Sequence, residues 1–74
     1  MIMPVAFIEE GKSVIVNNII MSEAMGKKLR EMGIAHGSSI DIIKNDGVSV
    51  ILGVSGSRLA LDMSMARKIM VQQN

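Results

Sequence analysis

The chain has no cysteine, no tryptophan, no tyrosine and a single phenylalanine among its 74 residues. The lack of cysteine excludes disulfides, iron–sulfur clusters, thiolate zinc sites and cysteine nucleophiles. Aromatic residues make up only 1% of the chain, which argues against the stacking platforms that bind single-stranded nucleic acid. A net charge of +1 provides no strong field to attract nucleic acid or an anionic membrane. We therefore expect no nucleic-acid partner.

Long apolar runs are also missing. Stretches such as residues 14–16 and 50–52 are far shorter than the roughly 20 residues that a membrane-spanning helix needs. The apolar segment at residues 1–8 lacks the basic leader of a signal peptide. We therefore expect one cytoplasmic domain over residues 1–74, with no direct insertion into a membrane.

One helix is predicted over residues 22–32. Ser22 is a good N-cap residue, and Gly33 has the backbone freedom that the position after a helix needs. Between them, apolar residues recur at helical spacing and form one stripe that we expect to face the core: Met21, Met25, Leu29 and Met32.

The remainder of the chain follows the period-two pattern of β-strands. Five short strands are predicted, at residues 12–18, 39–44, 48–54, 58–61 and 69–72. Asp46-Gly47 and Gly56 mark tight turns between them, and a short helical turn at residues 65–68, capped by Asp62 or Ser64, precedes the last strand. The fold class is thus mainly β: a small, strongly bent antiparallel sheet that closes into a barrel, with one inserted helix.

Some apolar residues fall on the face opposite the predicted barrel interior. They are Ile15, Ile43, Ile51 and Met70. Either the helix and the N-terminal segment cover them, or they form an exposed apolar patch, which on a small domain usually marks a partner or dimer surface.

The sequence offers little catalytic apparatus. His36 is the only histidine and is predicted to lie in a turn, where a solvated side chain is the usual outcome. No phosphate-binding loop of the G-x-x-x-x-G-K-[ST] kind is present. The acidic residues that might pair for acid–base work are scattered: Glu31, Asp41, Asp46 and Asp62. We therefore expect no enzyme.

The eight methionines raise the question of a soft metal site. Thioethers suit Cu(I) and are poor ligands for Fe(II). Because the helical methionines share the face that we expect to be buried, core packing explains them better. Met63 and Met65 alone are too few for a copper site.

The helix also carries the basic residues Lys27, Lys28 and Arg30 on its polar side. Such a run is usually solvated surface, although it can form a weak electrostatic docking patch. Glu23 and Glu31 dilute its charge.

Four segments resemble the FeoA family, small cytoplasmic proteins of bacterial ferrous iron transport. Residues 29–37, L-R-E-M-G-I-A-H-G, resemble the family's L-x-x-L/M-G-[ILM]-x-P-G element. Residues 58–71 resemble its closing R-x-A-L-x-x-x-x-A-x-x-I-x-V, and residues 9–16 and 39–44 resemble its first strand and the strand after the second glycine. Two departures are His36 in place of proline and the short Asn45-Asp46-Gly47 loop.

This resemblance implies an SH3-like barrel and a role as an accessory to FeoB, a membrane permease with a cytosolic GTP-binding domain. The expected partner-binding residues are Lys27, Lys28, Arg30, Ile43 and Ile51. Family members are also described as associating with transition metals. Because the sequence has no clustered ligand set, we expect no resident cofactor and at most transient, weak binding of Fe(II) or another divalent metal.

An alternative stays open. The same domain type resembles the C-terminal part of iron- and manganese-dependent repressors of the diphtheria-toxin-repressor family. Since the chain has no helix-turn-helix, it would act as a free-standing SH3-like regulatory module that does not bind DNA itself. A weak transition-metal-binding protein and a homo-oligomer are further possibilities.

Overall fold

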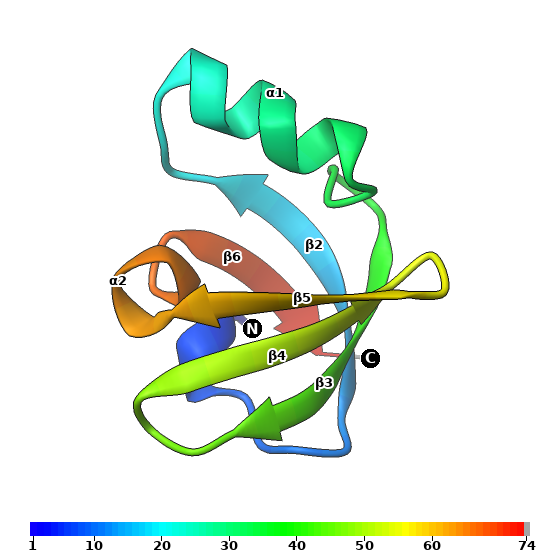
Figure 1. The fold of residues 1–74 in the computed structure, drawn as a ribbon, viewed down its shortest axis with the longest axis vertical. Helices are drawn as coiled ribbons and strands as arrows, with labels where there is room; N and C mark the ends of the chain where they lie inside the picture. The colour runs from blue at the N-terminus through cyan, green and yellow to red at the C-terminus, as the bar shows by residue number, and fades with distance from the viewer. Residues whose placement is uncertain (74) are drawn as a thin grey trace.

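The computed structural model describes residues 1–73 as one antiparallel sheet of six strands with two helices and a 3-10 turn (Figure 1). The elements are β1 (Ile2–Pro4), η1 (Val5–Phe7), β2 (Ser13–Ile19), α1 (Glu23–Glu31), β3 (Ser39–Asn45), β4 (Ser49–Val54), β5 (Ser57–Asp62), α2 (Met63–Ala66) and β6 (Ile69–Gln73). The mainly β fold class, with one inserted helix and a short helix before the last strand, is confirmed. Asn74, the last residue of the predicted domain, lies outside the described residues.

The strands follow the order β1-β6-β2-β3-β4-β5, so β1 and β5 are the two edges of the sheet. The sheet curves around the core, but these edges are not joined, and the barrel is therefore open. The ladder between β2 and β6 shifts between Val16 and Asn18, and the ladder between β3 and β4 shifts between Ile42 and Lys44. Such bulges bend and twist a sheet, which helps this short sheet to wrap around its core.

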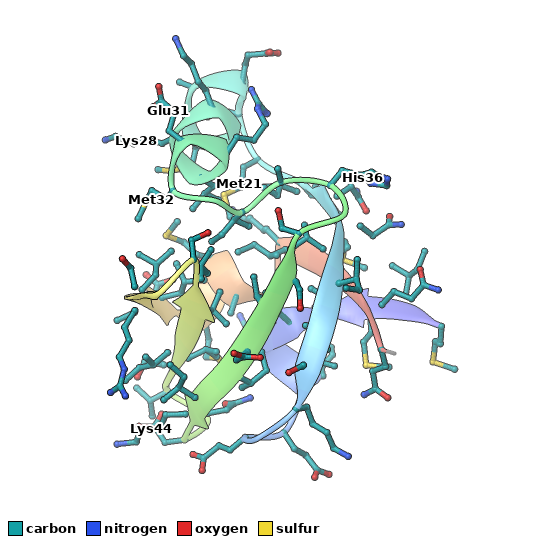
Figure 2. All side chains as sticks on the ribbon, turned by 90° about the vertical axis from the view of Figure 1, so that its right-hand side faces the viewer. Met21, Lys28, Glu31, Met32, His36 and Lys44 are labelled. Carbon is teal, nitrogen blue, oxygen red and sulfur yellow. The ribbon has the colours of Figure 1, made fainter. Side chains whose placement is uncertain are left out.

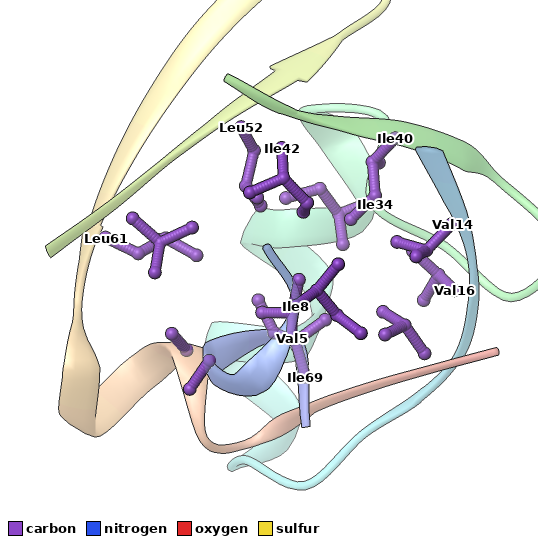
Figure 3. Packing of buried hydrophobic residues seen from close by; sticks show 14 of the residues in the cluster. Val5, Ile8, Val14, Val16, Ile34, Ile40, Ile42, Leu52, Leu61 and Ile69 are labelled. Atoms are coloured by element: carbon purple, nitrogen blue, oxygen red, sulfur yellow. The ribbon is translucent and has the colours of Figure 1, made fainter. Parts of the chain in front are cut away.

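Sixteen apolar residues form the core (Figure 3). Alternate residues of the strands face it, as the period-two pattern predicts. The N-terminal segment also enters the core, because Val5, Ala6 and Ile8 are buried. These residues of the N-terminal segment therefore pack on the core side of the sheet and not over its outer face. No polar or charged residue among residues 1–73 is buried.

The predicted ends of the helix are confirmed. Ser22 Oγ accepts a hydrogen bond from the Met25 N–H at 3.3 Å, and Gly33 follows the helix with φ of +98°. At this end the Gly33 N–H donates to the Arg30 carbonyl and the Ile34 N–H donates to the Leu29 carbonyl. These two bonds form a Schellman motif, which satisfies carbonyls that the helix leaves free.

The predicted buried stripe of this helix is only partly correct. Leu29 and Gly26 are buried, whereas Met25 is 36% exposed and Met32 is 46% exposed. The reason is that α1 lies across one end of the sheet and not along its outer face (Figure 1). Ile34, which follows the helix, is fully buried and provides the core contact expected of Met32.

Three further details differ from the sequence-based expectations. Strand β1 was not predicted, because three residues are too short for a recognisable alternation. Val48 is 76% exposed, since β4 begins only at Ser49. Helix α2 begins earlier than expected, because Asp62 Oδ1 accepts the Met65 N–H at 2.8 Å and caps it at Met63. Within residues 1–73, neither helix has the length and apolar character that crossing a membrane requires.

Candidate docking surface

All polar chemistry of the described chain lies at its surface. Among residues 1–73 there is no group of three or more histidine, cysteine, aspartate or glutamate side chains placed to hold a metal ion. The candidate sites are therefore surface grooves and patches, and three of them involve residues singled out from the sequence.

The first is a groove of about 330 Å³ between α1 and the end of β2. His36 lies at its rim, and its Nδ1 is 2.6 Å from the Asn17 carbonyl oxygen. Because a carbonyl only accepts, Nδ1 carries the hydrogen, and Nε2 of the neutral ring is left as an acceptor. Glu23 and Arg30 line the same groove with opposite charges. The groove can hold a small polar ligand, but its side chains provide no full coordination set.

The basic residues of α1 do not share one face. Lys27 and Lys28 are exposed and line a shallow depression with Met25 and Glu31 on the outer side of the helix. Arg30 instead folds back along the helix, and its Nη1 lies 3.3 Å from the place that a Cβ on Gly26 would take. The structure therefore groups Lys27 and Lys28 and places the guanidinium of Arg30 at the groove beneath α1.

The two isoleucines lie on the outer face of the sheet. Ile43 is the extra residue of the bulge between β3 and β4, is 37% exposed, and its side chain lies over Gly53. Ile51 is half-buried and pairs with Lys44 on one side and Ala60 on the other. The two other residues assigned to this face, Ile15 and Met70, are half-buried.

The five predicted partner-binding residues therefore fall into separate regions. Figure 2 shows Lys28 on α1 at the top of the molecule and Lys44, the cross-strand neighbour of Ile51, at the opposite end. Sequence reasoning missed that Met25 adds an exposed apolar side chain to the lysine region. Met25 lies four residues before Leu29 on the same helical stripe. The difference in their burial therefore arises only from how the helix lies on the sheet.

Sequence reasoning also missed a third groove, of about 290 Å³, between the C-terminal end of α1 and the start of β5. Met32 and Leu59 line it, with Glu31 and Arg58 beside them. No pattern in the sequence brings these segments together, because their proximity depends on the packing of Gly33 against Val54 and Ser55, which are distant in the chain.

The one described carboxyl group with a clearly shifted pKa belongs to a turn and not to a groove. Backbone N–H groups of Ser49 and Val48 donate to Asp46 Oδ1, each at 2.9 Å, and lower the pKa of that carboxyl below its ordinary value. These bonds favour the charged form. Asp46 thus closes the β3–β4 turn, which is a structural role.

Comparison with known proteins gives a consistent match. The family model of the FeoA domain matches residues 3–73. A candidate Fe(2+) transport protein A of Methanocaldococcus jannaschii is 39% identical over 69 residues, which cover 93% of this chain and 84% of that protein. The crystal structure of an iron uptake regulatory protein (FeoA) superposes with a TM-score of 0.87 at 28% identity, and the match covers 100% of this chain and 99% of that one.

The fold also occurs in a larger protein. A manganese-dependent transcriptional repressor contains a region that superposes with a TM-score of 0.84. The identity is 14%, and the match covers 99% of this chain but 42% of the repressor chain. This likeness concerns the fold alone.

Proposed function

Because the chain belongs to the FeoA family, we propose that it is a non-enzymatic accessory protein of ferrous iron transport. It acts in the cytoplasm and binds the cytosolic GTP-binding part of a FeoB-type membrane permease. Through this contact it influences transport or GTP hydrolysis without chemistry of its own. The observation that carries the proposal is the family match, which spans residues 3–73.

The surface of the structure is consistent with a binding role. The core is wholly apolar among residues 1–73. The polar side chains of these residues therefore remain at the surface, where a partner can contact them. Of the two candidate regions, we favour the outer side of α1, where the ammonium groups of Lys27 and Lys28 flank the exposed Met25. An apolar contact surrounded by charges gives both affinity and orientation. The Ile43 and Ile51 region is the alternative docking face.

The test is a heteronuclear NMR titration of the ¹⁵N-labelled chain with the GTP-binding domain of the cognate permease. Shifts or line broadening confined to α1 support the proposal and assign the docking face. Changes centred on Ile43 and Ile51 support the partner but move the face to the outer side of the sheet. A spectrum that is unchanged at saturating partner concentration contradicts the proposal.

A second function is favoured by the likeness to the repressor region. The chain would then be a free-standing SH3-like module that binds a peptide segment of a regulator. A titration of the labelled chain with a purified metal-dependent repressor distinguishes the two, because only the regulatory function predicts shifts in that experiment.

Weak binding of a transition metal is the third candidate. The neutral His36 ring offers one nitrogen ligand and Glu23 lines the same groove, which is a set suited to at most a transient divalent ion. Anaerobic calorimetric titration with Fe(II) and Mn(II) tests it. Absence of binding below about 1 mM removes this candidate.

A further inference from the structure

Strand β5 has an open edge. It lies at one edge of the sheet, and among residues 1–73 only β4 pairs with it (Figure 1). Val54 and Ser57 flank the two-residue turn between these strands. In such a hairpin the flanking residues exchange both backbone hydrogen bonds, and the bonded pairs then alternate along the ladder. The pairs bonded to β4 are therefore those of Ser57, Leu59 and Leu61.

The alternate residues of β5 direct their backbone groups to the open side. These are Arg58, Ala60 and Asp62, and all three are exposed. Such an edge offers N–H and C=O groups at the spacing that another strand needs. The backbone chemistry of the edge therefore selects an extended strand as its occupant.

The sequence of β5, S-R-L-A-L-D, complements itself in antiparallel orientation. When two copies are aligned about Ala60, Arg58 of each faces Asp62 of the other, and Leu59 faces Leu61. The edge-directed residues 58, 60 and 62 then lie opposite one another, so the same register that pairs the charges also completes the hydrogen-bond ladder. A shift by one residue would lose both.

The groove beside this edge fits the same register. It measures about 290 Å³ and is lined by Met32, which is 46% exposed, and by Leu59. In the alignment about Ala60, Met63 of the second copy follows opposite Ser57, which lines the groove. Met63 is itself half-buried at the start of α2. Pairing would therefore shield apolar side chains of both copies from water.

We propose that two copies of this chain associate through antiparallel pairing of their β5 strands, so that one sheet continues through both molecules. Two Arg58–Asp62 pairs and one apolar groove on each copy select a second copy over an unrelated strand. Because one strand buries little area, the association is weak and reversible. It does not use Lys27, Lys28 or the groove beneath that helix, and its interface is centred on β5 and not on α1.

The first experiment is sedimentation equilibrium of the full chain from about 1 µM to about 1 mM, a range suited to a weak dimer. Arg58→Glu places like charges opposite Asp62 and is expected to weaken the dimer at least about tenfold. Lys12→Glu makes the same change of charge at the residue before β2, a strand that β3 and β4 separate from β5. This control variant is expected to leave the dimer unchanged. A chain that is monomeric at about 1 mM overturns the proposal.

A mixing experiment tests the charge pairs directly. Asp62→Lys alone is also expected to weaken the homodimer, because Arg58 then faces a lysine. When the Arg58→Glu and Asp62→Lys variants are mixed, both pairs regain opposite charges, and dimers are expected to return. Since Asp62 also caps α2, the fold of that variant is checked by its NMR spectrum. A mixture as monomeric as its components contradicts the pairing.

The backbone ladder is tested without a change of charge. Ala60→Pro removes an N–H that no strand of the same copy uses, so the variant is expected to fold and to remain monomeric. The lack of native cysteine allows a second probe, because Ala60→Cys places two thiols on opposed residues about 5.5 Å apart at Cα, within disulfide range. A wild-type dimer whose affinity is unchanged by Ala60→Pro and Arg58→Glu would use another surface and would overturn the proposal.

Discussion

The side chain of Ile43 occupies the space above Gly53: its Cδ1 lies 3.0 Å from the place that a Cβ on Gly53 would take. Because Ile43 is the extra residue of the β3–β4 bulge, this contact fixes where the bulged side chain rests on the outer face. The absence of a side chain at Gly53 therefore leaves the space that the Ile43 side chain occupies.

We expect Gly53→Val to lower the free energy of unfolding by about 1 kcal/mol, because the new side chain displaces Ile43. The same change in an Ile43→Ala background should cost less, since the space is then free. Urea unfolding of the four proteins of this double-mutant cycle measures the coupling. Equal costs in both backgrounds would show that the contact is unimportant.

Gly33→Ala is expected to destabilise the chain by about 2 kcal/mol. Its φ of +98° disfavours any side chain, and a Cβ there would lie 2.9 Å from both Val54 Cγ1 and Ser55 Oγ. Gly37→Ala is the matched control, because that residue has φ of +87° but nothing within 4 Å of a Cβ. The difference between the two unfolding free energies isolates the contact between α1 and the β4–β5 turn. If the two variants cost the same, this contact is not tight.

Asn45 ties the N-terminal segment to β3. Its Nδ2 donates to the Ala6 and Ile8 carbonyls at 3.0 and 2.9 Å. Asn45→Ala should lower the free energy of unfolding by about 2 kcal/mol, because it leaves the Ala6 and Ile8 carbonyls without this donor. Asn45→Asp should lower it at least as much, because a carboxylate cannot donate a hydrogen bond. Hydrogen exchange should accelerate most at residues 5–8. Uniform acceleration over the whole sheet would contradict this local role.

The pKa of Asp46 lies below its ordinary value of 3.8 because the backbone N–H groups of Ser49 and Val48 donate to its carboxylate. A carboxyl group whose pKa is lowered by folding stabilises the protein above the unfolded pKa and loses that contribution as pH falls through the folded pKa. The unfolding free energy should therefore decline below about pH 4, and less steeply in Asp46→Asn. Carboxyl ¹³C shifts of Asp46 against pH measure the midpoint directly. A midpoint at or above the ordinary value would refute the prediction.

The double variant Lys27→Glu, Lys28→Glu should weaken binding of the permease GTP-binding domain by about tenfold, because it reverses the charge beside Met25. Lys12 is an exposed lysine outside α1, and Lys12→Glu should leave this affinity unchanged. Fluorescence anisotropy with a labelled chain measures the three affinities. Loss of binding in Ile43→Ser, with the lysine variant unaffected, would assign docking to the outer face of the sheet.

The elements that could be predicted from the sequence are those with a recognisable local signal. Ser22 and Gly33 mark the two ends of α1 by cap chemistry, and Asp46-Gly47 marks the β3–β4 turn. The longer strands follow from alternation alone. Strand β1 has three residues and no such pattern, so only its pairing with β6 reveals it.

The candidate site was less accessible to sequence reasoning. The spacing of Met25 and Met32 is that of a buried stripe, but a nine-residue helix lying across the end of a sheet buries few of its side chains. Alternation does place Ile43 and Ile51 on the outer face, but it does not reveal the bulge that sets Ile43 over Gly53. Both facts depend on how distant segments meet, which no local pattern records.

The position of β6 between β1 and β2 has a consequence for how the molecule is made. Within residues 1–73, residues 2–4 pair only with residues 70–72, so β1 has no place in the sheet until β6 is synthesised. During synthesis the β2–β3–β4–β5 meander can form early, because its strands are neighbours in the sequence. Val5 and Ile8 can be buried only after these strands have formed a core. Completion of the fold therefore requires β6, and the distant β1–β6 contact is expected to form late.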